Sequence, residues 1–272
     1  MAKSMRLIEE NLKVVDAVLY VLDARAAFSC LNPSFDKLLQ GRNKKALYIL
    51  NKCDLADPEA SPLLLEHFGK MGAAILSTGT DRAMVKGVLE KLRELLTEKI
   101  EKNRKKGIML PMRAMVIGIP NSGKSTIINT LCGNKKTLTG DRPGVTRGKQ
   151  WVKISEDVEL MDTPGTLWNA FDDQKAARHL AYIGSINDDV TDSEQLCACL
   201  LDELKELYPK LLKTKYGVDL FLPSHEILHQ ISIKKGCLKG GEADTLRGAR
   251  AILDDFRKAK IGRITLERPQ DA

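Results

Sequence analysis

Two kinds of segment are missing from this chain of 272 residues. No run of about 18 apolar residues occurs, so the sequence predicts no helix that spans a membrane. The first residues, MAKSMRLIEE, lack the apolar core of a signal peptide and turn acidic too soon for a transit peptide. We therefore expect a protein that stays in the cytoplasm, the compartment where it is made.

Closely paired cysteines are scarce as well. The chain has six cysteines but no Cys-x-x-Cys pair, and only Cys197 and Cys199 are near each other in sequence. Disulfide frameworks and cysteine-based zinc sites depend on such pairs. We expect neither, and we expect reduced thiols of the kind usual in the cytosol.

What the chain does contain is an ordinary soluble composition with an uneven distribution of charge. It is 43% hydrophobic and 29% charged, with a net charge of +7. Residues 185–272 carry 14 Lys and Arg against 15 Asp and Glu, so the basic excess lies earlier in the chain. Residues 234–268 nevertheless hold ten basic and five acidic side chains. This basic end suits the phosphates of a nucleic acid, although a solvated helix face would carry similar charges.

Short apolar runs alternate with amphipathic stretches through the first two thirds of the chain. Such alternation predicts a parallel sheet with helices on both faces. The expected strands are 16–23, 44–52, 73–76, 112–118, 150–155 and 158–162, of which the last two form a pair. The expected helices of this part are 3–14, 58–71, 81–102 and 124–131. From residue 173 onward the pattern is helical only. We expect an α/β domain over 1–184 and a small helical domain, suited to RNA, over 185–272.

GIPNSGKS, residues 118–125, fits the phosphate-binding pattern G-x-x-x-x-G-K-S. Its glycines let backbone N–H groups approach phosphate oxygens, Lys124 would reach the β and γ phosphates, and Ser125 would ligate Mg²⁺. The stretch follows an expected strand and opens an expected helix, whose N-terminus favours anions. We expect phosphate contacts from Asn121, Ser122, Gly123, Lys124, Ser125 and Thr126.

NKCD, residues 51–54, fits the guanine-binding pattern N-K-x-D. Asp54 can accept hydrogen bonds from guanine N1–H and the 2-amino group, which adenine lacks, and sites built this way discriminate by about 10⁴ or more. Lys52 would lay its stem along the base, and Asn51 would tie this motif to the phosphate loop. Ser77 and Thr78, at the tip of the next strand, would support the base. A simple strand-end turn would use similar residues, and the phosphate loop favours the guanine interpretation.

DTPG, residues 162–165, follows another expected strand, some 40 residues beyond the phosphate loop. Asp162 would hold Mg²⁺ through water, and the Gly165 N–H would meet the γ-phosphate.

The guanine motif precedes the phosphate loop, the reverse of the usual GTPase order. In an open parallel sheet, ligands bind at the carboxyl ends of the strands, which converge whatever their order along the chain. Where two termini lie close together, they can be joined and the chain opened elsewhere. The sequence therefore predicts a circularly permuted P-loop GTPase domain, with EKNRKKGIMLP (101–111) as the join.

These residues resemble the circularly permuted bacterial ribosome-assembly GTPases of the ribosome-biogenesis GTPase A (YlqF) family. The resemblance runs nearly end to end, through MAKSMRLIEENLKVVDAV, DARAAFSCLNP (23–33), PGVTRG (143–148), DTPGTLW (162–168), KKGCLKGGEAD (234–244) and DFRKAKIGRI (255–264). It implies GTP and GDP as ligands and a role in late maturation of the large ribosomal subunit. It also implies that the helical domain contacts ribosomal RNA.

The resemblance implies two further site residues. Thr146 matches the mobile-loop threonine that meets Mg²⁺ when GTP is bound. Asn121 matches a phosphate-loop asparagine that helps to hold K⁺ near the phosphates in similar GTPases.

Two departures concern catalysis, for which no residue is assigned. Many GTPases place a water-orienting Gln directly after DxxG, but Thr166 stands there. The family, which lacks this Gln, is thought to use a His just before its M-A-K segment, and the printed sequence starts at Met1-Ala2-Lys3. Either the start is trimmed or misassigned, or the intrinsic rate is very low. We expect slow turnover in isolation.

HEILH, residues 225–229, matches the zinc-peptidase pattern H-E-x-x-H. Ser224 before it resembles an N-cap and Gly236 a helix stop, which makes this one short helix of a small domain without an evident third ligand. We favour the structural interpretation over the metallopeptidase one. The leading hypothesis is a GTP-hydrolysing assembly factor for the large ribosomal subunit, and its alternative is a nucleotide-sensing RNA-binding module with negligible hydrolysis.

Overall fold

The computed structural model describes residues 2–133, 151–162, 173–188 and 191–269. Within these residues one sheet has six strands in the order β3-β2-β1-β4-β6-β5. All of its neighbouring strands are parallel except β5, an antiparallel edge strand on β6. The strands are β1 (Ala17–Asp23), β2 (Lys45–Asn51), β3 (Ala73–Ser77), β4 (Met112–Ile117), β5 (Trp151–Lys153) and β6 (Val158–Asp162).

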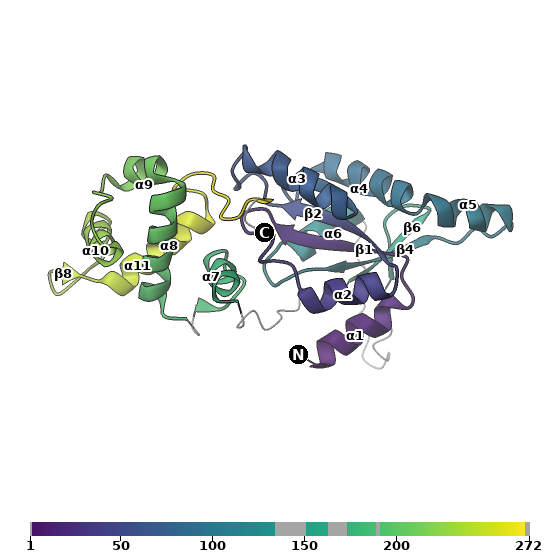
Figure 1. Cartoon of the computed structure of the whole chain (residues 1–272), viewed down its shortest axis with the longest axis horizontal. Helices are drawn as coiled ribbons and strands as arrows, with labels where there is room; N and C mark the ends of the chain where they lie inside the picture. The colour runs from purple at the N-terminus through teal and green to yellow at the C-terminus, as the bar shows by residue number, and fades with distance from the viewer. Residues whose placement is uncertain (1, 134–150, 163–172, 189–190, 270–272) are drawn as a thin grey trace.

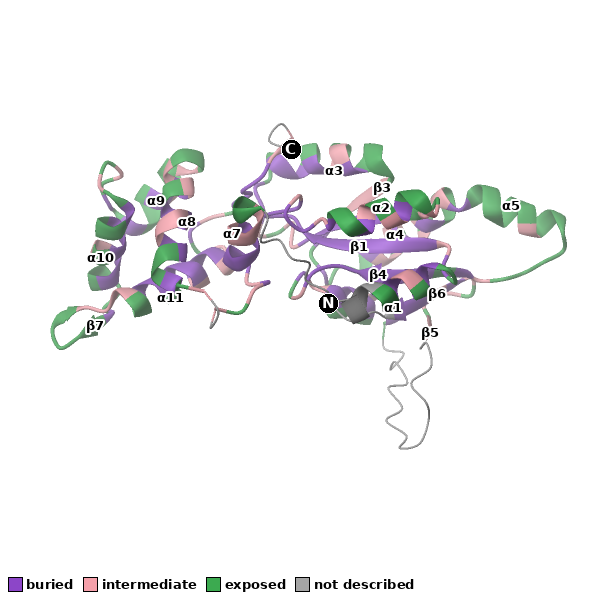
Figure 2. Cartoon of the chain, turned by 60° about the horizontal axis from the view of Figure 1, so that its bottom comes forward, coloured by how far each residue is buried: buried purple, intermediate pink, exposed green. Residues whose placement is uncertain are grey.

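Helices cover both faces of this sheet, because its central strand is apolar on both sides. Val18, Tyr20 and Leu22 of β1 belong to one buried cluster, and Leu19 and Val21 belong to another. The first cluster includes side chains of α1, α2 and α3, and the second includes α4 and α6. These helices are α1 (Ala2–Leu12), α2 (Pro33–Gly41), α3 (Ala60–Met71), α4 (Arg82–Leu95) and α6 (Lys124–Cys132). Figure 2 shows the inner strands β1 and β4 in the buried colour. The predicted α/β layers and the circular permutation are confirmed.

Two details of the first domain differ from the sequence prediction. The long helix expected over 81–102 breaks at Leu96, which ends α4 and precedes α5 (Thr97–Lys105). Helix α2 was not predicted, although Asn32 gives a clear start signal. Its side-chain oxygen accepts hydrogen bonds from the Ser34 and Phe35 N–H groups at 3.0 and 3.4 Å, and Pro33 stands in the first turn.

The rest of the described chain is mainly helical, as predicted, but it also has one short ladder and an irregular segment after residue 257. The helices are α7 (Gln174–Tyr182), α8 (Ser193–Leu207), α9 (Pro209–Tyr216), α10 (Ser224–Lys234) and α11 (Thr245–Arg257), with β7 (Leu238–Lys239) pairing β8 (Glu242–Ala243). In Figure 1 the helices α8 to α11 lie at one end of the molecule, the sheet lies at the other, and α7 lies between them. The proposed boundary at residue 184 stays a prediction, since one buried cluster continues from the sheet through α7 into these helices.

The start of α10 corrects one expectation. Ser224 is not an N-cap, because its hydroxyl donates to Asp202 of α8 at 2.5 Å instead of accepting from its own helix. His225 and His229 are exposed on this helix. Among the described residues no group of three His, Cys, Asp or Glu side chains is arranged to hold a metal ion. The same part of the chain has no helix of the length and apolarity that crossing a bilayer requires.

The C-terminal segment returns to the sheet. In Figure 1 the yellow segment that follows α11 runs to the sheet, away from the far helices. The Leu266 N–H donates to the Arg25 carbonyl at 2.7 Å, and the Ile264 N–H donates to the Leu55 carbonyl at 3.2 Å. The last described residues therefore lie against the carboxyl ends of β1 and β2.

Candidate nucleotide-binding site

The sequence motifs emerge from one edge of the sheet. Parallel register pairs Asp23 with Asn51, and Asn51 with Ser77, so three neighbouring strands end at the same level. On the other side of β1, strand β4 runs into the phosphate loop, and Val116 of β4 pairs with Asp162 of β6. The carboxyl edge therefore brings together segments that are far apart in sequence.

The phosphate loop turns tightly into α6, and its glycines are sterically required. Gly118 has a φ of +151°, and a Cβ there would lie 2.4 Å from the Val21 carbonyl oxygen. Gly123 has a φ of +96°, and a Cβ there would lie 2.2 Å from the Asn51 amide nitrogen. The Lys124 ammonium, buried at the start of α6, donates to the Ile119 carbonyl at 2.6 Å.

The guanine motif lies directly against this loop. The Asn51 amide donates to the Ser122 carbonyl at 2.8 Å, which is the tie that the sequence predicts for Asn51. The Lys52 ammonium donates to the Asn121 carbonyl at 2.7 Å. Lys52 itself has a left-handed φ of +59°, a conformation that costs energy for a residue with a side chain. The turn after β2 is therefore held in one shape, with the exposed Asp54 at its tip.

The predicted base-supporting segment after β3 joins the same cluster. The Ser77 hydroxyl accepts from the Gly79 N–H at 2.8 Å, and the Thr130 hydroxyl of α6 donates to the Gly79 carbonyl at 2.7 Å. Thr78 is exposed between them. This segment is thereby fixed to the helix that begins at the phosphate loop.

The structure brings together the side chains or backbone of Asn51, Lys52, Ser77, Asn121, Ser122, Gly123 and Lys124, while Ser125 and Thr126 are exposed in the first turn of α6. Thr146, Gly165 and Thr166 lie outside the described residues, as does the side chain of Asp162. The roles of all these residues toward a nucleotide stay predictions.

A buried carboxylate beside the guanine motif was not predicted. Asp23, at the end of β1, contacts the Arg25 guanidinium at 2.7 Å and the Lys52 ammonium at 2.9 Å. Burial alone would raise the pKa of Asp23, but the two cations outweigh it and lower the pKa to about 2. The signal was present, because an acid at the end of a strand next to NKCD belongs to the same edge of the sheet.

A second unpredicted residue supports the guanine turn from the far end of the chain. Arg263 donates to the Ala56 carbonyl through Nε and to the Cys53 carbonyl through Nη2, both at 2.9 Å. These contacts hold the backbone on both sides of Asp54 and Leu55. A separation of 210 residues between Arg263 and Cys53 leaves no local sequence signal for this contact.

The phosphate loop also touches the end of α7. The Asn121 side chain donates through its amide nitrogen to the Gly184 carbonyl at 2.7 Å, and the Ser185 hydroxyl donates to the Pro120 carbonyl at 2.9 Å. The phosphate loop is therefore in direct contact with the segment that links α7 to the C-terminal helices.

A buried histidine joins α7 to α8 and the C-terminal segment. His179 is fully buried, with Nδ1 2.7 Å from Glu267 and Nε2 2.9 Å from Glu203. Glu267 also accepts from the Phe28 N–H at 2.7 Å and from the Ser29 hydroxyl. Burial lowers the pKa of His179, but the two carboxylates outweigh this and raise it to about 9. His179 is therefore an imidazolium at neutral pH.

This histidine predicts a loss of stability at alkaline pH. The folded pKa lies above the usual value near 6.5, so the contribution of His179 is complete below about pH 6.5 and is lost as the pH rises through 9. The shift corresponds to about 3 kcal/mol. Urea unfolding of the wild type at pH 6.5 and 9.5 should show a fall of this order. His179→Gln serves as the control, since it removes the titrating group, and equal pH dependence in both proteins would contradict the assignment.

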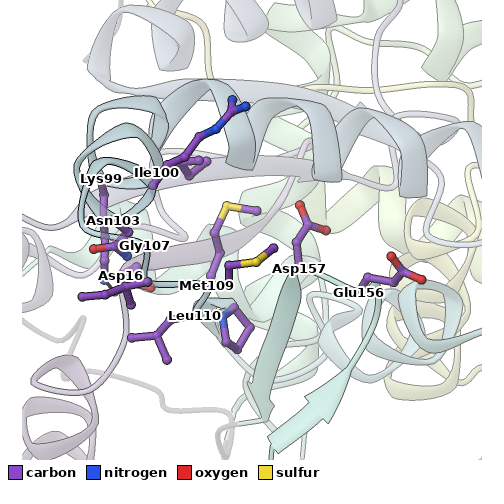
Figure 3. A pocket seen from close by; sticks show the side chains of 13 residues that line it. Asp16, Lys99, Ile100, Asn103, Gly107, Met109, Leu110, Glu156 and Asp157 are labelled. Carbon is purple, nitrogen blue, oxygen red and sulfur yellow. Dashed lines mark hydrogen bonds and ion pairs between the residues drawn. The ribbon is translucent and has the colours of Figure 1, made fainter.

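A separate hollow of about 610 Å³ lies beside the join of the permutation, next to α5 and the start of β4 (Figure 3). The exposed Met109 and Leu110 line it, and its carboxylates at Asp16 and Asp157 are paired with Lys99 and Arg93. It contains no residue of the predicted nucleotide site. The motifs of the predicted nucleotide site lie at the opposite edge of the sheet, where the strands have their carboxyl ends.

Comparisons with known proteins point to one group. Residues 113–215 match the model of a family described as 50S ribosome-binding GTPase. The chain is 37% identical to ribosome biogenesis GTPase A of Priestia megaterium, over 100% of this chain and 96% of the relative. It is 30% identical to ribosome biogenesis GTPase A of Thermotoga maritima, over 99% and 92% of the two chains. The crystal structure of GNP-bound YlqF from T. maritima superposes with a TM-score of 0.70 at 26% identity, over 99% of this chain and 100% of that one.

Proposed function

Because this chain belongs to the ribosome biogenesis GTPase A family, we propose that it binds and hydrolyses GTP as an assembly factor for the large ribosomal subunit. The observation that carries the proposal is the 2.8 Å hydrogen bond from Asn51 to the Ser122 carbonyl. It joins a guanine-binding turn to a phosphate loop, so a guanine nucleotide can span the two. If the guanine-binding turn and the phosphate loop were far apart, one nucleotide could not contact both.

Each end of the nucleotide would meet its own group of residues. Asp54, exposed at the tip of its turn, would accept hydrogen bonds from guanine, and the Lys52 stem would lie along the base. Lys124 would exchange the Ile119 carbonyl for the β and γ phosphates. The N–H groups of the phosphate loop and the N-terminus of α6 would complete the cradle.

Magnesium would be held beside the phosphates by Ser125, Thr146 and Asp162. The Ser125 hydroxyl is exposed in the first turn of α6, and oxygen ligands of this kind suit Mg²⁺. When bound, the ion neutralises charge that develops on the phosphates during transfer. Gly165 would donate its N–H to the γ-phosphate.

Asn121 is the proposed contact for K⁺. Its amide nitrogen already donates to the Gly184 carbonyl, and a cation would use the amide oxygen. We expect faster GTP hydrolysis in KCl than in NaCl, measured as phosphate release at matched ionic strength. Equal rates in the two salts would remove K⁺ from the proposal.

Catalysis is expected to be slow in the isolated protein. Thr166 occupies the place where many GTPases carry a water-orienting Gln. Bound ribosomal subunits are expected to accelerate the step. Thr166 also favours the second candidate, a nucleotide-sensing RNA-binding module with negligible hydrolysis. Single-turnover kinetics with and without subunits separate the two, since only the first function predicts acceleration.

The proposed partner is the ribosomal RNA of the large subunit, in the cytoplasm, at a late stage of its maturation. We assign the contact to the helical part, residues 185–272, and the GTPase activity to residues 1–184. Residues 234–268 carry ten basic side chains against five acidic ones. Arg263 and Arg268 contact the turn after β2, so the exposed Lys239, Arg247 and Arg250 are the better candidates, because basic surfaces bind nucleic-acid backbones.

Co-sedimentation with ribosomal subunits tests this assignment. The protein is incubated with large or small subunits in GDP, GTP or a non-hydrolysable GTP analogue, and pelleted through sucrose. We expect binding to the large subunit that depends on the nucleotide and weakens with salt. Equal recovery with all nucleotides, or with small subunits, would contradict the assembly role and leave GTP binding intact.

A further inference from the structure

The Asp23 carboxylate lies fully buried between two cations, one of which belongs to the guanine motif. Arg25 donates to both of its oxygens, from Nε to Oδ1 at 2.9 Å and from Nη2 to Oδ2 at 2.7 Å. Lys52 places its ammonium 2.9 Å from the same Oδ2. The Oδ2 atom of Asp23 therefore contacts two cationic groups.

Arg25 alone would balance the charge of Asp23, so the contact with Lys52 needs its own explanation. Lysine is a long flexible side chain that loses much rotamer freedom when it is fixed. The Lys52 ammonium is held on one side by Asp23 and on another by the Asn121 carbonyl at 2.7 Å. The end of the Lys52 side chain is therefore fixed between β1 and the phosphate loop in the absence of a nucleotide.

We propose that Asp23 is a positioning residue of the guanine pocket, which holds the Lys52 side chain in the place where the base stacks on it. The inference rests on the proposed function, because it assumes that guanine binds at Lys52 and Asp54. Pre-ordering one face of the pocket removes an entropic cost from binding. Asp23 then raises nucleotide affinity without touching the nucleotide.

The side chain that binds Asp23, Arg25, is itself fixed by contacts with a helix. Arg25 is buried, donates through Nη1 to the Arg257 carbonyl at 3.0 Å and lies over the Phe256 ring at 5.5 Å. Both partners belong to the end of α11. The rotamer of Asp23, and through it the position of Lys52, therefore depends on the contact between Arg25 and the end of α11.

A double-mutant cycle on the full chain tests the proposal. The affinity for GDP is measured by calorimetry for the wild type, Asp23→Asn, Lys52→Met and the double variant. Asp23→Asn removes a charged contact of Lys52, so the affinity of this variant for GDP should be about ten- to a hundredfold lower than that of the wild type. In the Lys52→Met background the same change should alter the affinity by less than about twofold. The affinity for pyrophosphate, measured separately, should change by less than about twofold in Asp23→Asn.

Three results would overturn the inference. One is wild-type affinity in Asp23→Asn, another is the same loss in both backgrounds, and the third is an equal loss for pyrophosphate and GDP. If the wild type itself fails to bind GDP, the proposed function is wrong and this inference falls with it. If Asp23→Asn does not fold, Asp23→Glu keeps the charge that Arg25 needs but moves the oxygens away from their place beside Lys52. It should show the same base-specific loss, and unchanged affinity for GDP would refute the proposal.

The matched control is Asp57→Asn, which removes another buried carboxylate at the same turn. Asp57 accepts from the Tyr208 hydroxyl at 2.9 Å and pairs with Arg268 at 3.1 Å, so it faces the C-terminal segment. It should lower stability while leaving GDP affinity within about twofold of the wild type. Equal losses of GDP affinity in Asp57→Asn and Asp23→Asn would count against a specific role for Asp23.

Discussion

Asp54→Asn is expected to weaken GDP binding by about 10³-fold or more. Guanine presents two donors, N1–H and the 2-amino group, and the Asp54 carboxylate offers two acceptors. An asparagine has one acceptor and one N–H₂ group, so one guanine donor would face another donor. Asp54 is exposed at the tip of its turn, and the substitution should leave the fold unchanged.

The same variant should prefer a different base. Xanthine carries a carbonyl oxygen where guanine carries the 2-amino group, and the asparagine N–H₂ can donate to that oxygen. Competition titrations with GDP, xanthosine diphosphate and ADP measure the change, and xanthosine diphosphate should become the tightest ligand. Glu90→Gln, at an exposed carboxylate on α4 paired with Lys86, is the control and should bind as the wild type does. GDP binding at wild-type strength by Asp54→Asn would remove Asp54 from the guanine site.

Lys124→Ala should have the largest effect on the reaction, a fall of about 10²- to 10³-fold in the single-turnover rate of GTP hydrolysis. The Lys124 ammonium is buried at the phosphate loop and bonded to the Ile119 carbonyl. On nucleotide binding it is expected to meet the β and γ phosphates, where negative charge accumulates in the transition state. The affinity for GTP should fall more than that for GDP, because only GTP has the γ-phosphate.

The rate is best measured with large subunits present, where hydrolysis is expected to be fastest. Circular dichroism and a thermal unfolding curve establish that the variant is folded. Lys86→Ala removes a lysine that is 82% exposed on α4 and should hydrolyse GTP at the wild-type rate. If Lys124→Ala retains the wild-type rate while folded, the phosphate loop does not act as proposed.

The elements that the sequence predicted well share one property, which is that their signals are local. The strands of the sheet and the turn of GIPNSGKS are specified by apolar runs and by glycines within a few residues. The observed φ of +96° at Gly123 and the contact with Asn51 there show why no other residue fits. NKCD could be placed at the same edge as the phosphate loop because parallel strands end together.

The errors in the sequence prediction also came from local signals. The amphipathic pattern over 81–102 continues through Leu96, and nothing in it marks the break between α4 and α5. Serine is a residue type that often caps the N-terminus of a helix, but the Ser224 hydroxyl donates to Asp202 of another helix. A local preference can be overridden by a partner that only the packing supplies.

Local motifs were enough to predict a phosphate loop and a guanine-binding turn, and to place both at one edge of the sheet. The contacts that hold these motifs in place became visible only in the folded chain. His179 meets Glu267 across 88 residues, and Arg263 reaches the turn after NKCD across 210. Motifs are readable because backbone shape and side-chain chemistry act over a few residues. Buried ion pairs are not, because a charge is stabilised by whatever opposite charge the folded chain brings within a few ångströms.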